Sequence, residues 1–597
     1  MNETMLKKEI NGIRKFLESN YVPLLIFFSS IFLLISFSGT RLFFSDEGII
    51  LDQFYNLIHG SLALKMAKID TARGVLITVG DNLYGVFSYS LLILSLPAFY
   101  LLRLIESVYG AHLFILQMWA LCGGIIVYLI AWNRKFKHTI LYGTIAYFLL
   151  IFSNLYYFKP INFPKWGELL SIELTNIFVT SILILVVFLL FRKLFGQKIG
   201  IFASFFVLFA TPISFYAITL KHHSLTIFLT LLAFYFFYKY YEQREDKFLY
   251  FAYISSGLCV WTRTLDGAVL LASLVIADIF VSKRSIKHLV SIFIVILISL
   301  LPFFIFNYLI LGDPFSIVDN MPLSDKNTVL VTAKDFISLE GTKSNIKQVE
   351  LLNELGYIWT GNIKGYWSEI LGYTLFLKLI NTFGVFLVSP FLILAITFII
   401  YMIKRMIKLN AIDKFLGLYV LILFGAYFIL YKFFNKNALM SLITDTPMEL
   451  EYRYLLILYV ILLYFVLRID RVKEIIEEKS GTIIQLYGII LVIFMIYFIA
   501  GFPIKFMYMY YYVSIIISSS LFLLITTYPT GKKGEQNIHF WEKVLLFLIS
   551  FSIAQATAFL LFYYWAVTIS YVSPSQNYAI IPILNHIIEW MYQTIIY

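Results

Sequence analysis

Long apolar runs recur along the whole chain, and this feature restricts the fold more than any other. A helix needs about 20 mostly apolar residues to cross the roughly 30 Å hydrocarbon core of a bilayer. About fifteen runs approach or reach that length, at residues 21–38, 113–132, 140–158, 172–191, 199–217, 224–240, 248–262, 267–281, 289–310, 380–402, 415–432, 453–467, 482–502, 510–528 and 544–565. Charged residues make up only 14% of the chain, against about 25% in soluble proteins. The sequence therefore predicts an all-α, polytopic membrane protein with about 13–15 transmembrane helices, and it excludes a soluble enzyme.

Basic residues concentrate in every second loop. If the N-terminus lies in the cytoplasm, the short internal segments hold more than half of the 46 Lys and Arg residues, among them Arg134, Lys135 and Lys137. This alternation is the positive-inside pattern of membrane proteins. The net charge of +11 therefore indicates orientation and contact with anionic headgroups, and not a nucleic-acid partner. We expect a multi-pass protein of the cell membrane with a cytoplasmic N-terminus.

Two long segments fall on the outer side in this topology, at residues 39–112 and 311–370. They divide the chain into a transmembrane module at 1–310 that includes the first external loop, a second external loop at 311–370, and C-terminal transmembrane helices at 371–597. A helix bundle alone needs no such loops, so we expect chemistry on the outer face, with the second loop gating the acceptor.

Residues 83–102 in the first external loop are apolar enough to be counted as a further span. Counting them would move Arg134, Lys135 and Lys137 to the outside, against the charge pattern. We therefore expect interfacial helices here, with a break at Pro97. Residues 48–65 predict another interfacial helix.

Asp46 and Glu47 follow the outer end of the first predicted span, in the sequence RLFFSDEGI. Charged side chains near hydrocarbon are costly, and they therefore suggest a functional site. Two adjacent carboxylates in a confined site increase the proton affinity of one of them, which suits a general base. The alternative is a solvated acidic pair at the start of an interfacial helix, where the helix dipole favours carboxylates.

Several cations lie near the outer ends of predicted spans, against the positive-inside trend. They are Lys221, His222, His223, Arg263 and Arg453, and three further cations, Arg41, Lys65 and Arg73, lie in the first external loop. A phosphate group would explain them, because Arg binds it through a bidentate fork and Lys through a point charge. For any one of them, the alternative is snorkelling of the charged head towards water. Asp266, three residues after Arg263, is placed to pair with that arginine or to cap the next helix.

Six patches, in order along about residues 20–470, resemble the C-type membrane glycosyltransferases of the dolichyl-phosphate-mannose protein mannosyltransferase and lipid A aminoarabinose transferase type. They are SDEG, DNLYGVFSYSLLILSLPAFYLL, ATPISFYAITLKHHSLTIFLTLLAFY, SSGLCVWTRTLDGAVLL, NYLILGDPFS and EYRYLLILYV. The chain departs from the family pattern at Thr264 and Leu265, where the family has a proline after the arginine, and in lacking the prolines of the late helix. The WWDYG signature of oligosaccharyltransferases is absent, which argues against transfer of a whole glycan.

The resemblance implies a membrane glycosyltransferase that moves a single hexosyl or pentosyl unit from a polyprenyl-phosphate donor. The acceptor would be a glycan, lipid or protein on the extracytoplasmic face, and the transfer would usually invert the anomeric centre. Asp46, from the family's acidic motif, would be the general base, and Glu47 would orient the acceptor or help a divalent cation. A phosphate leaving group needs fixed cations, for which the candidates are Lys221, His222, Arg263 and Arg453. Further candidate site residues are Arg41, Arg73, His223 and Asp266.

A rival interpretation is a non-catalytic lipid or polysaccharide transporter or flippase, which would use a similar groove and similar basic residues. The two differ in whether a carboxylate and a cluster of cations converge on one point. A structural scaffold is a third interpretation, but it leaves the external polar residues without a role. The sequence requires no cofactor. It allows Mg²⁺ or Mn²⁺, and it contains no HxxxH or HExxH spacing that would predict zinc.

Overall fold

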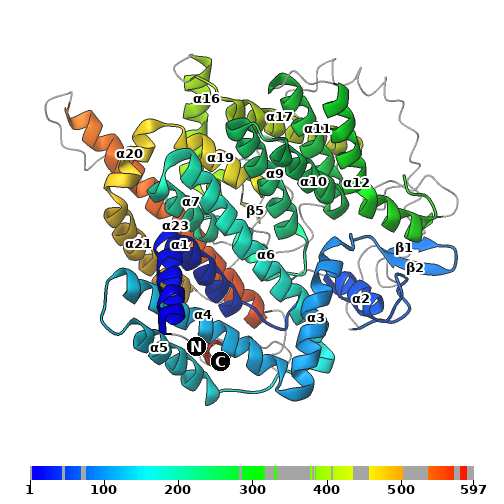
Figure 1. The fold of residues 1–597 in the computed structure, drawn as a ribbon, viewed down its shortest axis with the longest axis horizontal. Helices are drawn as coiled ribbons and strands as arrows, with labels where there is room; N and C mark the ends of the chain where they lie inside the picture. The colour runs from blue at the N-terminus through cyan, green and yellow to red at the C-terminus, as the bar shows by residue number, and fades with distance from the viewer. Residues whose placement is uncertain are drawn as a thin grey trace.

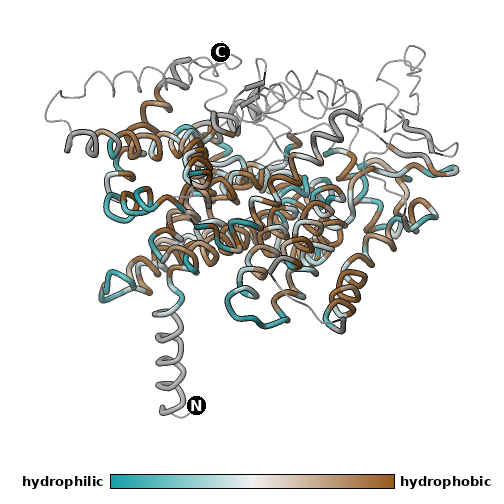
Figure 2. Tube along the Cα trace, turned by 90° about the horizontal axis from the view of Figure 1, so that it is seen from above, coloured by the Kyte–Doolittle hydropathy of each residue, from teal (hydrophilic) through white to brown (hydrophobic). Residues whose placement is uncertain are grey.

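A computed structural model describes most of the chain. The described residues are 3–43, 47–68, 76–281, 286–315, 328–331, 377–378, 382–383, 385–404, 408–433, 456–501, 535–570, 579–587 and 590. Within them the chain is mainly helical, as the apolar runs predict, and the helices pack side by side in one body (Figure 1). Hydrophobic residues line most of the helices, and hydrophilic residues gather mainly at the connections (Figure 2).

The N-terminal half holds the elements that later form the site. Its helices are α1 (Glu3–Ser36), α2 (Glu47–Ile58), α3 (Ser90–Val108), α4 (Ala111–Asn133), α5 (Thr139–Leu155), α6 (Phe163–Phe195), α7 (Gln197–Phe209), α8 (Ile213–Tyr216), α9 (His223–Gln243), α10 (Asp246–Thr262), α11 (Thr264–Val281) and α12 (Ile286–Leu311). Helices α9 to α12 match four consecutive predicted spans closely.

The C-terminal half contributes shorter and more broken helices. They are α15 (Val385–Val388), the 3-10 helix η3 (Pro390–Leu394), α16 (Ala395–Ile403), α17 (Ala411–Phe433), α19 (Ile457–Leu467), α20 (Asp470–Glu478), α21 (Ser480–Gly501) and α23 (Glu535–Ser570).

Five described helical stretches are long and apolar enough to cross a membrane. They are Ser19–Ser36, Ser90–Val108, Ala111–Asn133, Phe163–Phe195 and His288–Leu311, and the bent pair α20–α21 makes a sixth if it is one broken span. Shorter apolar helices, among them Thr139–Leu155 and Ile457–Leu467, coincide with further predicted spans. The protein is therefore a polytopic helical membrane protein, and the number of spans stays a prediction.

Helix α6 lies at the centre and packs against α1, α3, α7 and α9 (Figure 1). Pro164 lies in its first turn, where the missing amide hydrogen costs nothing. Gly196 ends it with φ of 97°, a conformation that favours glycine, and α7 begins at the next residue. Most residues of α6 are buried, among them the polar residues Glu168, Glu173 and Asn176.

Two predicted spans are interrupted. The run 199–217 divides into α7 and the short α8, and Pro212 stands directly before α8. The run 380–402 begins with strand β5 (Thr382–Phe383) and continues as α15, η3 and α16, with Pro390 starting η3. Proline lacks the amide hydrogen that a continuing helix needs, which accounts for the two breaks.

The expected break at Pro97 is wrong. Helix α3 runs from Ser90 to Val108 with Pro97 inside it. One face of α3 is buried through Leu91, Leu92, Phe99 and Leu102, and the helix packs against α6. This burial outweighs the roughly 3 kcal/mol that an interior proline costs.

The predicted first external loop also contains strands, which we did not predict from the sequence. Strands β1 (Leu76–Val79) and β2 (Asn82–Gly85) form an antiparallel hairpin, and β3 (Thr328–Val331) from the predicted second loop pairs with the other edge of β1. A second, two-stranded sheet joins β4 (Leu377–Lys378) to β5. The hairpin lies beside α2 at one side of the molecule (Figure 1).

Candidate active site

Glu47 is the first residue of α2 and is fully buried. One of its carboxylate oxygens accepts a hydrogen bond from the amide of Phe43, and the other accepts one from the amide of Leu220 at 2.8 Å. The N-terminus of a helix favours a carboxylate because the backbone dipole is positive there. Glu47 therefore joins the acidic motif to the α8–α9 connection. Asp46 lies outside the described residues.

Side chains of helix α6 bind the α8–α9 connection and the segment that leads from α1 to the acidic motif. The Asn176 amide donates to the carbonyl oxygens of Thr219 at 2.8 Å and Lys221 at 2.7 Å. Glu173, one turn earlier, accepts a hydrogen bond from the amide of Gly39 at 3.2 Å. Residues three apart lie on the same face of a helix, so this face of α6 fixes both segments.

Arg41 is buried beside this face. Its guanidinium donates to the Phe37 carbonyl at 2.9 Å and lies 4.9 Å from the centre of the Phe43 ring. Arg41 and Glu47 both interact electrostatically with Glu173. Arg41 does not snorkel, because its side chain is buried within the protein and does not extend to water.

Lys221 and His222 are buried next to an aromatic ring. Only 3% of Lys221 is exposed, and its ammonium lies 4.8 Å from the centre of the Phe87 ring, within cation–π range. The same ring lies 6.3 Å from the His222 ring. Phe87 is held in turn by Gln53 of α2, whose amide donates to the Phe87 carbonyl at 2.9 Å. These contacts exclude snorkelling for Lys221.

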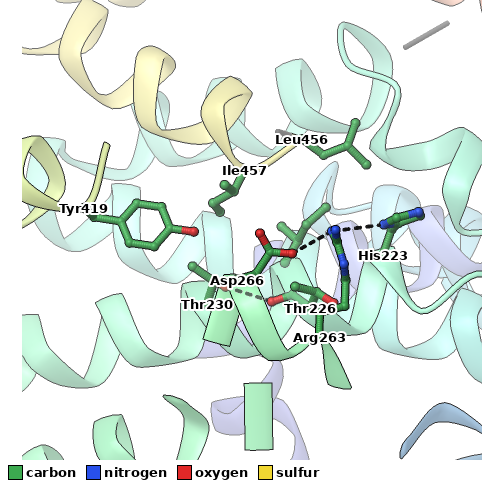
Figure 3. A pocket seen from close by; sticks show the side chains of 9 residues that line it. His223, Thr226, Thr230, Arg263, Asp266, Tyr419, Leu456 and Ile457 are labelled. Atoms are coloured by element: carbon green, nitrogen blue, oxygen red, sulfur yellow. Dashed lines mark hydrogen bonds and ion pairs between the residues drawn. The ribbon is translucent and has the colours of Figure 1, made fainter. Parts of the chain in front are cut away.

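Arg263 and Asp266 form a buried ion pair, with 2.7 Å between guanidinium and carboxylate (Figure 3). The same guanidinium nitrogen lies 3.5 Å from Nδ1 of His223. The pairing alternative for Asp266 is confirmed, and the residue also lies in the first turn of α11. Arg263 thus already has a carboxylate partner, which lowers its availability to a phosphate.

Arg263 owes its position to the junction between α10 and α11. Its backbone is extended. The Arg263 amide donates to the Cys259 carbonyl of α10, and the Arg263 carbonyl accepts a hydrogen bond from the Gly267 amide of α11. A Cβ atom on Gly267 would lie 2.1 Å from the backbone nitrogen of Val260. The two helices approach this closely only because residue 267 has no side chain.

A small cavity borders this ion pair, as Figure 3 shows. It is lined by His223, Thr226, Thr230, Arg263, Asp266 and Tyr419, among others. Its volume of about 10 Å³ is enough for about one water molecule. It is therefore too small for a sugar or a lipid phosphate.

Six of the predicted site residues come together. Glu47 binds the amide next to Lys221. We use the name cation row for four neighbouring residues: Lys221, His222, His223 and Arg263. The row ends at Asp266, which pairs with Arg263. Arg41 adjoins Glu173. Asp46, Arg73 and Arg453 lie outside the described residues, so the structure places none of these three.

Three residues of the site were not predicted from the sequence: Glu173, Asn176 and Phe87. The first two lie in a run that was read as a plain apolar span, although a carboxylate within such a run is itself a sign of function. In the part of the chain that the structure describes, no three His, Cys, Asp or Glu side chains group as metal ligands. Backbone amides engage both oxygens of Glu47, which makes this residue a poor cation ligand.

The family comparison bears on these same helices. Residues 167–306, which run from α6 to α12 and include the whole cation row, match the family model of dolichyl-phosphate-mannose-protein mannosyltransferases. This match supports a membrane glycosyltransferase. No similar protein was found among the curated proteins.

Among solved structures, the chain is similar to ArnT from Cupriavidus metallidurans in the apo state. The TM-score is 0.36 at 12% identity, over 94% of this chain and 77% of that one. At this TM-score the likeness carries no argument about this chain. The family match confirms that this chain resembles the C-type membrane glycosyltransferases, through the segment that carries its cation row.

Proposed function

We propose that the protein transfers a single sugar from a polyprenyl-phosphate donor to a glycan, lipid or protein acceptor on the extracytoplasmic face of the cell membrane, with inversion. Asp46 is the general base that takes the proton of the acceptor. Lys221 and His222 bind the donor phosphate and stabilise the negative charge that develops on it as the glycosidic bond breaks.

One observation carries this proposal. Glu47 accepts a hydrogen bond from the amide of Leu220, next to Lys221, so a segment of the acidic motif and the cation row meet in one place. Residues 47 and 220 are far apart in sequence, and a protein that only bundled helices would have no need for this contact. A base next to an anion-binding group is what transfer from a lipid phosphate requires.

The roles of Glu47 and Arg263 differ in this proposal from those expected from the sequence. Glu47 is a positioning residue, because backbone amides engage both of its oxygens. Arg263 acts behind the site, because Asp266 already neutralises it. Arg453 and Arg73 remain candidates for further phosphate contacts.

The test is a transfer assay with the purified full-length protein in detergent and a radiolabelled polyprenyl-phosphate hexose. We expect labelled product from the wild type and a loss of roughly 10²-fold or more in Asp46→Asn, because a general base contributes about 10²- to 10⁴-fold. Asp81→Asn is the matched control, since Asp81 is an exposed residue of the same segment, in the β1–β2 turn. Equal rates for Asp46→Asn and the wild type would remove Asp46 from the mechanism.

A further inference from the structure

Residues 579–587, which we call the strap, pair with the segment that leads to the acidic motif. The amide of Ile580 donates to the Ser38 carbonyl at 3.0 Å, and Gly39 and Ala579 form an antiparallel bridge. Ala579 and Ile580 are both buried in the hydrophobic core. Two segments from opposite ends of the chain are thus joined directly before the acidic motif.

His112, the second residue of α4, binds the strap through its ring. The Ile161 amide donates to Nδ1 at 3.2 Å, so this nitrogen carries no hydrogen. In a neutral imidazole the proton then lies on Nε2, which donates to the Ile580 carbonyl at 2.6 Å. The ring is buried and stacks on Phe158, with 4.7 Å between centroids. Both ring nitrogens of His112 are therefore hydrogen-bonded, one of them to the strap.

Helix α5 binds the strap at a second place. The side-chain oxygen of buried Asn154 accepts a hydrogen bond from the Ile583 amide at 2.9 Å. Tyr157, two residues after the end of α5, stacks on His586 with 4.2 Å between ring centroids. The strap is therefore held by side chains of two elements as well as by its backbone pairing.

The segment that pairs with the strap is also bound to the site. The Gly39 amide donates to Glu173 of α6 at 3.2 Å. Further along, the Phe43 amide donates to Glu47, and the Phe43 ring packs edge-on against Phe215 of α8, with 5.1 Å between centroids. The chain between Gly39 and Glu47 is thus held at both ends, and the strap is one of the groups that hold it at Gly39.

We infer that the strap positions the acidic motif, and that His112 and Asn154 are positioning residues that act through the strap. The effect on sugar transfer rests on the proposed function, in which Asp46 is the base. The coupling between the strap and residues 38–43 does not rest on it, because that coupling follows from the hydrogen bonds alone.

The coupling is tested without turnover, by hydrogen–deuterium exchange of the full-length protein in detergent. The reporters are the hydrogen-bonded amides of Ile580 and Ile583 in the strap and of Gly39 and Phe43 before the acidic motif. His112→Asn keeps an acceptor at the place of Nδ1 but removes the donor to the strap, whereas the matched control His112→Gln keeps a donor at the place of Nε2.

We expect both the strap peptide and the peptide with residues 38–43 to exchange about 10-fold faster in His112→Asn than in the wild type, because a buried carbonyl loses its donor. His112→Gln should exchange like the wild type. Asn154→Leu removes the partner of Ile583 from a different helix and should act like His112→Asn, so the test does not depend on one substitution. Unchanged exchange in both disruptive variants, or faster exchange in the strap peptide alone, would overturn the inference.

The effect on the reaction is tested in the transfer assay by a double-mutant cycle with Asp46→Asn. We expect His112→Asn to lower kcat roughly 10-fold, as a displaced catalytic group does, with KM for the donor within a few-fold of the wild type. His112→Gln should keep both constants. In the Asp46→Asn background, His112→Asn should cost little, because the base that the strap positions is absent.

An equal loss in both backgrounds would show that the strap supports only the fold, and it would overturn the positioning role. If the wild type transfers no sugar, the proposed function fails, while the exchange experiment still decides whether the strap holds residues 38–43.

Discussion

At the scale of single residues, the site depends on buried polar side chains that bind backbone groups far away in the sequence. Glu47 binds the Leu220 amide, and Asn176 binds the Thr219 and Lys221 carbonyls. Each of these bonds is made away from water, where an unmade hydrogen bond costs more than the net gain from a made one. The position of Lys221 is therefore set by residues that do not touch the substrate.

Asn176→Asp tests this positioning. The change keeps the shape of the side chain but replaces the NH₂ group that donates to two carbonyl oxygens with a carboxylate oxygen that repels them. We expect a loss of about 1–3 kcal/mol in stability, measured as a lower thermal unfolding temperature in detergent, and a lower kcat/KM for the donor. Asn82→Asp, at an exposed position of β2, is the control. An Asn176→Asp protein that unfolds and turns over like the control would show that Asn176 does not position the loop.

Residue chemistry explains how far the sequence could predict the site. Asp266 and the cations of the row stand out because charges near the ends of apolar runs are conspicuous. Glu173 and Asn176 do not stand out, because they are single polar residues in the long apolar run of α6. The contact between Glu47 and Leu220 could not be predicted at all, since no local pattern encodes a contact between segments so distant in sequence.

At the scale of elements, the helix pair α10–α11 is joined by backbone contact at Gly267. Gly267→Ala would place a methyl group 2.1 Å from the backbone of Val260, which no side-chain movement relieves. We expect destabilisation of about 1–3 kcal/mol from overpacking and a displaced Arg263. The readout is the thermal unfolding temperature in detergent.

The matched control is Gly417→Ala in α17, where the added Cβ meets nothing within 4 Å. Alanine is a better helix former than glycine by about 1 kcal/mol, so this variant should unfold at the same or a higher temperature. If both variants behave alike, close packing at Gly267 does not hold the junction.

Elements also differ in how well the sequence predicted them. Helices α9 to α12 follow unbroken apolar runs and were predicted nearly to their ends. The β1–β2 hairpin was missed, although the β-rich LITV before Gly80 and Asp81 is a sign of a two-residue hairpin loop. Pro97 was misjudged because local propensity predicts a break and tertiary packing against α6 overrides it.

At the scale of the whole molecule, the positive-inside pattern predicts orientation. An exposed residue after α4, Lys135, should face the cytoplasm, and exposed Asp81 in the hairpin should face outward. In intact cells a membrane-impermeant maleimide should label Asp81→Cys and not Lys135→Cys, in a background without the two native cysteines. The reverse pattern would place the cation row on the cytoplasmic side.

The central claim is that the acidic motif and the cation row share one site for a lipid phosphate. An experimental structure of the full-length protein with bound polyprenyl phosphate tests it most directly. The account predicts phosphate density within hydrogen-bonding distance of Lys221 and His222, with Asp46 lining the same cavity. Phosphate bound elsewhere, or Asp46 directed into a separate space, would contradict it.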